Sequence, residues 1–203
     1  MYARDVPRLI DHEARELEIA EAAWRVLKRD GIKKLSVRTV AAEAGLATAS
    51  LRRAFPTQQA LFAYSLDCVQ KRVNQRIDSA PHGATLRDTV ETAVLQLLPL
   101  DEERRLEMEV FLVIGSMALS DDGLMPVYQQ ANNTMATGCR NVIDLLIRAG
   151  AASPALDAPL EAQKLHAIID GLALHLLRQR PDEPTSWATN VLRSHLDALE
   201  NAR

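Results

Sequence analysis

The spacing of the apolar side chains is the feature that most constrains how this chain folds, because it follows the helical period almost throughout. Leu17, Ala20, Trp24 and Leu27 recur every three or four residues, as they do on one face of an α-helix. No segment alternates apolar and polar residues with the period of two that is typical of a half-exposed strand. The pattern predicts an all-α protein of about nine helices.

Capping residues and glycines divide this pattern into separate helices. Ser36 and Thr48 are good N-caps for two short helices, and Gly45 stands where the first of these ends. Thr85 and Asp88 have the spacing of a capping box at the start of a later helix. We expect further helices near residues 58–78, 101–119, 124–149, 160–180 and 185–200.

Length and composition indicate a globular chain. Its 203 residues are 47% hydrophobic and 25% charged, which allows a substantial core. The apolar runs span only a few residues, far fewer than the roughly 20 that cross a bilayer, and no apolar region typical of a secretory signal follows Met1. Cys68 and Cys139 stand alone, as reduced core thiols do. We therefore expect a cytoplasmic protein with no membrane partner.

Charge is distributed unevenly along the chain. Residues 1–80 hold 14 Lys and Arg against 10 Asp and Glu, a net of +4, whereas residues 81–203 hold 10 against 17, a net of −7. A basic end on an acidic body suits a chain that presents one end to DNA. We predict a three-helix DNA-binding domain over residues 1–58 and a larger helical domain for ligand binding and dimerisation over residues 59–203.

Residues 37–55 have the features that a helix-turn-helix needs. Ala41 supplies a small side chain where two short helices approach, and Gly45 tolerates the positive φ of the turn between them. Arginines on the second helix can reach guanine edges or phosphates. A short helical hairpin inside a bundle, with its arginines in solvent, would show the same spacing. The residues expected on the exposed face of the second helix are Thr48, Ala49, Ser50, Arg52 and Arg53.

The sequence from Leu35 to Leu61 resembles the DNA-binding domain of the TetR (tetracycline-repressor) family. The order, spacing and type of residues agree over three consecutive helices, about residues 12–65. A fainter similarity, in Glu102–Met108 and Leu165–Leu174, is to the C-terminal domain of BetI-like members. The resemblance implies a dimeric regulator, most often a repressor, that binds an inverted-repeat operator and is released by a small molecule.

The resemblance also assigns DNA-facing residues and shows two departures from the family. It adds Thr39 to the DNA-facing set. Arg52–Ala54 replace residues that are often aromatic or histidine, which favours phosphate contacts. The lysine with which many members anchor a phosphate at the start of the fourth helix is replaced by Gln58 or Gln59. Lys33 and Lys34 either compensate for this lysine or lie at a solvated loop end, and with Ser36 they complete the predicted DNA-facing set.

Methionine and aromatic side chains of the second domain suit an adaptable apolar pocket, although ordinary core packing explains each of them as well. A polar cluster lies in the middle of a predicted helix, where it either supplies polar groups to such a pocket or faces solvent; its members are Tyr128, Gln129, Gln130, Asn132 and Asn133. The predicted ligand-binding residues are Met108, Phe111, Leu112, Met117, Met125, Tyr128 and His166.

The last two predicted helices carry more apolar residues than the terminal helices of a monomer usually show. Two copies of the chain would bury them in a four-helix interface. The resulting two-fold symmetry would place two recognition helices in successive major grooves about 34–36 Å apart. The predicted interface residues are Leu165, Ile169, Leu172, Leu176, Trp187, Val191, Leu192 and Leu196.

The sequence shows no set of residues that indicates catalysis or metal binding. No HxxxH or ExxH pair occurs, and the carboxylates cluster where predicted helices begin. We expect no enzyme activity, catalytic residue, metal or cofactor; the expected partners are a double-stranded DNA operator and an unknown small-molecule effector. A helical enzyme and an interaction module that has lost its operator are the alternatives. Arg4 and Arg8 precede the first helix, in a loose tail or in an arm that enters the minor groove.

Overall fold

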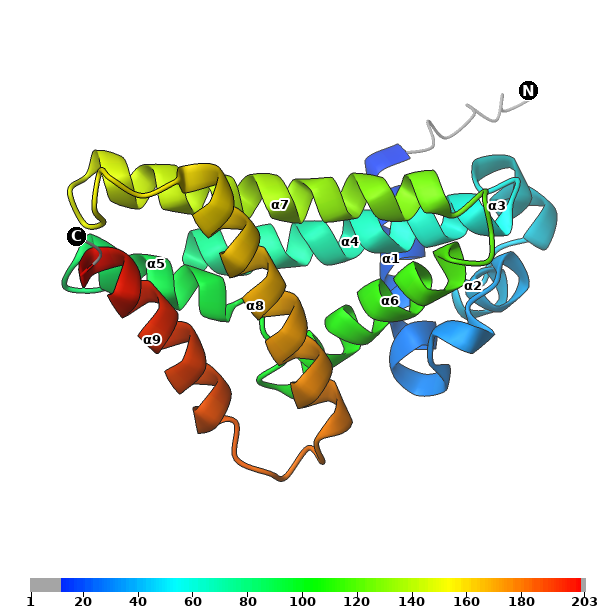
Figure 1. Ribbon diagram of the computed structural model, residues 1–203. Coiled ribbons are helices and arrows are strands. Elements are labelled where there is room, and N and C mark those ends of the chain that lie inside the picture. Colours follow the sequence, from blue (N-terminus) through cyan, green and yellow to red (C-terminus); the bar gives the residue numbers. More distant parts are fainter. Residues whose placement is uncertain (1–11, 202–203) are drawn as a thin grey trace, which may run out of the picture. The chain divides into compact units, whose positions relative to one another are not determined.

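The computed structural model describes residues 12–201, in which all regular structure is helical, so the predicted all-α class is confirmed (Figure 1). Arg4 and Arg8 lie outside the described residues. None of the helices within this range has the length and apolar character that crossing a membrane requires. The elements are α1 (His12–Asp30), the 3₁₀-helix η1 (Ile32–Lys34), α2 (Val37–Glu43), α3 (Thr48–Ala54), α4 (Gln58–Ser79), α5 (Leu86–Leu95), α6 (Glu102–Ala118), α7 (Met125–Arg148), α8 (Ala158–Arg178) and α9 (Ser186–Asn201).

The described chain packs as two units, the first ending at Leu61 and the second beginning at Phe62. The first unit holds α1, η1, α2, α3 and the first turn of α4, and the second holds the remainder of α4 with α5 to α9. The sequence places the division between residues 58 and 59, whereas compact packing of the first unit continues to the fully buried Leu61.

Small side chains allow the helices of the first unit to pack closely. Ala22 and Ala23 on α1 are buried, as are Val40 and Ala41 on α2. In this unit α1 packs against α2, and α2 packs against α3. Gly45 joins the last two with a φ of 65°, a conformation that side chains with a Cβ rarely adopt. The predicted use of alanine and glycine in this turn is therefore confirmed.

Two of the predicted helix caps are confirmed and one is wrong. Ser36 caps α2, and Thr85 with Asp88 forms the predicted capping box at the start of α5. Thr48, by contrast, is the first residue of α3 and not its cap. Ala47 takes the N-cap position with extended backbone angles, and no side-chain hydrogen bond caps this helix.

The core of the second unit is centred on α8. This helix packs against α6, α7 and α9. Each fully buried large apolar side chain contributes roughly 1.5–3 kcal/mol through the hydrophobic effect. The buried members of α8 are Glu161, Ala162, Leu165, Ile169, Leu172, Ala173 and Leu176.

In the second unit α4 buries Phe62 and Leu66, and ion pairs join it to α6. Arg76 on α4 donates two hydrogen bonds to the carboxylate of Glu107 on α6, at 2.7 Å and 2.5 Å. Arg72 lies one turn earlier on α4 and donates to Glu103 at 2.7 Å. Since Glu107 is buried, its pairing with Arg76 is the stronger of these two attachments.

Glu91 links α5 to α9. Its carboxylate accepts hydrogen bonds from Arg87 at 2.5 Å and from Arg193 at 2.7 Å, and Arg87 also pairs with Asp197. Burial opposes the ionisation of Glu91, but the hydrogen bonds from Arg193 and Arg87 outweigh it and hold the pKa of this carboxyl below its ordinary value. The network therefore stabilises the fold only while Glu91 is ionised.

The variant Glu91→Gln is expected to lower the free energy of unfolding by about 1–3 kcal/mol, since it leaves the guanidinium groups without their shared anion. A carboxyl with a depressed pKa in the folded state stabilises the fold above its unfolded pKa, and this contribution is lost as the pH falls through the folded pKa. Urea unfolding followed by circular dichroism, from neutral to acidic pH, should therefore show the two proteins converging in acid. Glu109→Gln, at an exposed position of α6, is the control. A constant difference across this range would contradict the assignment.

Gly115 allows α6 to approach Tyr128 of α7, because a Cβ at residue 115 would lie 2.6 Å from the tyrosine ring. We expect Gly115→Ala to destabilise the protein by about 1–2 kcal/mol through overpacking. Gly138→Ala on α7 is the matched control, since a Cβ there meets no atom within 4 Å. The control should raise stability by roughly 0.5–1 kcal/mol, as alanine does over glycine inside a helix. Thermal unfolding should show a lower midpoint for Gly115→Ala and a higher one for Gly138→Ala. Equal shifts of the two midpoints would contradict the role assigned to Gly115.

Candidate DNA-binding surface and ligand cavity

Burial of Leu51 fixes the orientation of α3. This leucine is the buried residue of the seven-residue helix, so it turns the opposite face outward. Ala49, Arg52 and Arg53 are exposed. The structure thus places both arginines on the free surface of the second helix of the helix-turn-helix, where their guanidinium groups are accessible to DNA.

Two other predicted residues of α3 are less accessible than the arginines. Thr48 and Ser50 are half-buried. Arg15 on α1 donates a hydrogen bond of 2.9 Å from its guanidinium to the Ser50 hydroxyl, which fixes the position of that side chain. Ser50 is therefore held by the protein itself, and its contact with DNA remains a prediction.

The DNA-facing residues predicted before and within α2 are of two kinds: exposed lysines, and hydroxyl residues that form hydrogen bonds within the protein. Lys33 and Lys34 are exposed on η1. Ser36 accepts a hydrogen bond from the backbone N–H of Thr39, and the Thr39 hydroxyl accepts one from the Ser36 N–H and donates one of 2.8 Å to the carbonyl of Lys34. The two hydroxyls thus hold the start of α2, and the two lysines remain available for phosphate.

Gln58 has an internal partner in place of the phosphate that a lysine would bind at this point. Its amide Nε2 donates a hydrogen bond of 2.7 Å to the carbonyl of Leu35. This bond ties the first turn of α4 to the segment between η1 and α2, all within the first unit. The glutamine at this position therefore adds a link within the first unit.

Glu43 is the acidic residue of α2, and two arginines of α1 neutralise it. Arg29 donates a hydrogen bond at 2.7 Å and Arg25 one at 2.8 Å. Arg29 and Arg25 together hold the pKa of Glu43 below its ordinary value. These pairs fasten α2 to α1 and reduce the repulsion that an unpaired carboxylate would exert on DNA phosphates.

A cavity of about 900 Å³ lies within the second unit, between α4, α5, α6, α7 and α8. Its volume is within the range of known small-molecule sites. The apolar lining residues are Leu66, Val69, Val73, Ile77, Ala93, Val94, Leu97, Met108, Phe111, Pro126, Ala131, Met135, Gly138, Cys139, Val142, Leu165 and Ile169. The polar ones are Gln70, Asn74, Gln96, Arg104, Glu107, Gln129, Gln130, Asn133, Thr134, Thr137 and Asn141.

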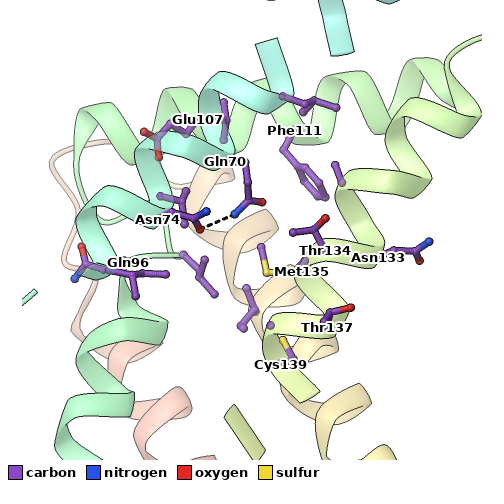
Figure 2. A pocket seen from close by; sticks show the side chains of 18 of the residues that line it. Gln70, Asn74, Gln96, Glu107, Phe111, Asn133, Thr134, Met135, Thr137 and Cys139 are labelled. Carbon is purple, nitrogen blue, oxygen red and sulfur yellow. Dashed lines mark hydrogen bonds between the residues drawn. The ribbon is translucent and has the colours of Figure 1, made fainter. Parts of the chain in front are cut away.

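An amide pair on α4 faces this cavity. Gln70 Nε2 donates a hydrogen bond of 2.8 Å to Asn74 Oδ1, and Figure 2 shows the pair opposite Thr134 on α7, with the Phe111 ring nearby. The bond leaves the Gln70 carbonyl and the Asn74 amide nitrogen without a hydrogen-bond partner among the described residues. The cavity therefore offers both an acceptor and a donor to a ligand.

Two of the seven predicted ligand-binding residues line the cavity, namely Met108 and Phe111. Tyr128 lies behind Phe111, with their ring centroids 5.4 Å apart, and His166 lies 3.6 Å from Asp170. The remaining predicted residues, Leu112, Met117 and Met125, are outside the lining as well. Gln70 and Asn74 were not predicted to bind ligand, although their spacing of four residues places two amides on one face of a helix.

Most of the predicted interface residues are buried within a single chain. Leu165, Ile169, Leu172, Leu176, Leu192 and Leu196 belong to the core that α8 and α9 share with α5 and α7. A side chain enclosed in this way has no surface left for a second copy, so these six assignments are corrected. Of the predicted residues, Trp187 and Val191 are exposed, with 38% and 46% of their surface accessible to solvent. Leu174, which was not predicted, is also exposed, at 40%.

Comparison with known proteins agrees with this division of the chain. The family model "Bacterial regulatory proteins, tetR family" matches residues 19–64, and the model "BetI-type transcriptional repressor, C-terminal" matches residues 86–200. The HTH-type transcriptional regulator PksA of Bacillus subtilis is 32% identical over 96% of this chain and 94% of its own length.

Solved structures show the same fold. A transcriptional regulator from Rhodococcus sp. Rha1 is 26% identical, with a TM-score of 0.73 over 92% of this chain and 96% of its own. The multidrug binding protein EbrR, complexed with ethidium, is 27% identical, with a TM-score of 0.63 over 89% of this chain and 98% of its own. Since both halves of the chain match family models and a curated regulator matches nearly its whole length, the protein belongs to the TetR family of transcriptional regulators.

Proposed function

We propose that the protein is a repressor that binds an inverted-repeat operator as a homodimer, in the cytoplasm, and leaves it when a small molecule enters the cavity of the second unit. The observation that carries the proposal is the exposure of Arg52 and Arg53 on α3, a helix whose orientation is fixed by Leu51. Lys33 and Lys34 add positive charge nearby in the same unit.

These cations suit a recognition helix in a major groove. Arginine donates two hydrogen bonds to guanine or binds phosphate, and lysine binds phosphate as a point charge. Arg52 and Arg53 follow each other on a helix, so their side chains leave it about 100° apart. We infer that one reads bases while the other contacts the DNA backbone, and that Lys33 and Lys34 extend the backbone contacts.

Three exposed apolar residues of α8 and α9 form the proposed dimer face. Leu174, Trp187 and Val191 are large side chains left in solvent, on the two helices that the sequence analysis assigned to dimerisation. The indole of Trp187 donates a hydrogen bond of 2.9 Å to Gln179, which holds the ring in place. A two-fold contact through this face would bury these side chains and pair two DNA-binding domains.

The cavity supports the ligand-controlled part of the proposal. EbrR, which shares this fold, is a multidrug binding protein solved with ethidium. A ligand releases DNA only to the extent that it binds one conformation more tightly than the other. Because α4 begins in the DNA-binding unit and continues as a cavity wall, we propose that ligand binding acts on DNA affinity through this helix.

The variant Arg52→Ala/Arg53→Ala is expected to abolish specific binding to the DNA upstream of the protein's own gene. Fluorescence anisotropy at several salt concentrations would measure this. Each phosphate contact that is lost should flatten the dependence of log affinity on log salt by about 0.9. Arg148→Ala/Arg180→Ala removes the same charge from exposed positions of the second unit and should leave operator binding unchanged. Equal affinities for the two variants would refute the proposed DNA surface.

The variant Val191→Arg is expected to convert the dimer to a monomer, because it places a charge in the centre of an apolar contact. Sedimentation velocity at micromolar concentration would show the change in mass. Leu119→Arg is the control, since Leu119, the residue after the end of α6, is 81% exposed and lies outside the proposed face. A wild-type monomer, or a Val191→Arg variant that stays dimeric, would rule out this interface.

A further inference from the structure

The cavity has almost no charge available to a ligand. Its charged lining residues are Glu107 and Arg104. Glu107 is buried and gives both carboxylate oxygens to Arg76, at 2.7 Å and 2.5 Å. Arg104 pairs with Asp101 at 2.9 Å and donates to the carbonyl of Leu95 at 3.1 Å. Each charge is thus satisfied by the protein itself.

The remaining polar groups around the cavity are neutral. They are amides and hydroxyls, with Gln70 and Asn74 on α4 and Thr134 on α7 placed around one space (Figure 2). Burial raises the pKa of the Cys139 thiol to about 11, so this lining residue is uncharged at neutral pH. Apolar side chains such as Phe111 and Met135 form much of the remaining wall. The site provides hydrogen bonds and apolar contact without a counter-ion.

We propose that the effector of this protein is an uncharged amphipathic molecule, with an apolar body against Phe111 and Met135 and a carbonyl, hydroxyl or amide group bound by the Gln70–Asn74 pair. A charged ligand would lose part of its hydration on entry and find no unpaired opposite charge among the lining residues, which weakens its binding. The bound ligand contacts α4 through hydrogen bonds. Only the regulatory role of this ligand rests on the proposed function, since its binding is measured without DNA.

A matched set of probes separates charge from shape. Ethidium is a phenanthridinium cation, and 3,8-diamino-6-phenylphenanthridine is the same ring system without the charge at mildly alkaline pH. A carboxylated analogue of that ring is the anion. Calorimetric titration of the full-length protein should show the uncharged probe binding at least about tenfold more tightly than either ion. Failure of the uncharged probe to bind, or equal binding of either ion, would overturn the proposal.

A substitution in the amide pair tests the location. Asn74→Asp places an unpaired carboxylate in the cavity and keeps an oxygen for the hydrogen bond from Gln70. The ratio of the two affinities should shift toward ethidium by about tenfold. Gln75→Glu adds the same charge to an exposed neighbouring position of α4 outside the lining and should leave the ratio unchanged. Equal shifts in both variants would show that the probes bind elsewhere.

A second substitution tests the hydrogen bonds. Gln70→Leu keeps the size of the side chain and removes the amide, so the uncharged probe should bind roughly tenfold more weakly. Gln75→Leu is the control.

If the protein binds its operator but prefers a charged probe, the proposed ligand class is wrong and the proposed function stands. If the uncharged probe binds but the protein binds neither the DNA upstream of its gene nor any other genomic DNA, the proposed function fails and the proposed ligand class stands.

Discussion

A buried ion pair between Arg76 and Glu107 joins α4 to α6, two of the helices that form the ligand cavity. In the second unit α4 packs less extensively against other helices than α8 does, and Arg76 fastens it to α6 with two short hydrogen bonds. A long side chain reaches across space that packed side chains would otherwise fill. The helix is thereby held in place while a cavity of about 900 Å³ remains beside it. A buried pair of this kind also neutralises the carboxylate that faces the ligand.

In the DNA-binding unit, by contrast, short helices pack in close contact. Alanines on α1 and α2 permit that contact, and polar groups near the joints are bound internally, as Gln58 is to the carbonyl of Leu35. A helix of seven residues is too short to be stable alone, so its position comes from tertiary packing. This packing leaves Arg52 and Arg53 as exposed side chains on a fixed support.

Local signals in the sequence predicted much of the fold. Caps at Ser36 and Thr85 and the turn at Gly45 act over a few residues, and for that reason the pattern located them. The Thr48 cap failed because Ala47, without any side-chain acceptor, adopts the backbone geometry of the cap. Propensity is a weak guide when packing decides where a short helix begins.

Non-local features were harder to predict. An apolar stripe such as that of Leu165, Ile169 and Leu172 looks the same whether it faces the chain's own core or a partner, since both environments exclude water. The cavity posed the same problem. Met108 and Phe111 were found by their chemistry, but the contribution of Gln70 and Asn74 depends on how far α4 stands from α7, which no local spacing encodes.

The partial exposure of the amide pair has a consequence for how this protein changes over evolutionary time. Asn74 is exposed and Gln70 half-buried, so replacing either removes little of the buried core that keeps the chain folded. Mutations at such positions are tolerated more readily than mutations in the core. The chemistry of the recognised compound can therefore diverge between descendants while the helical framework is conserved.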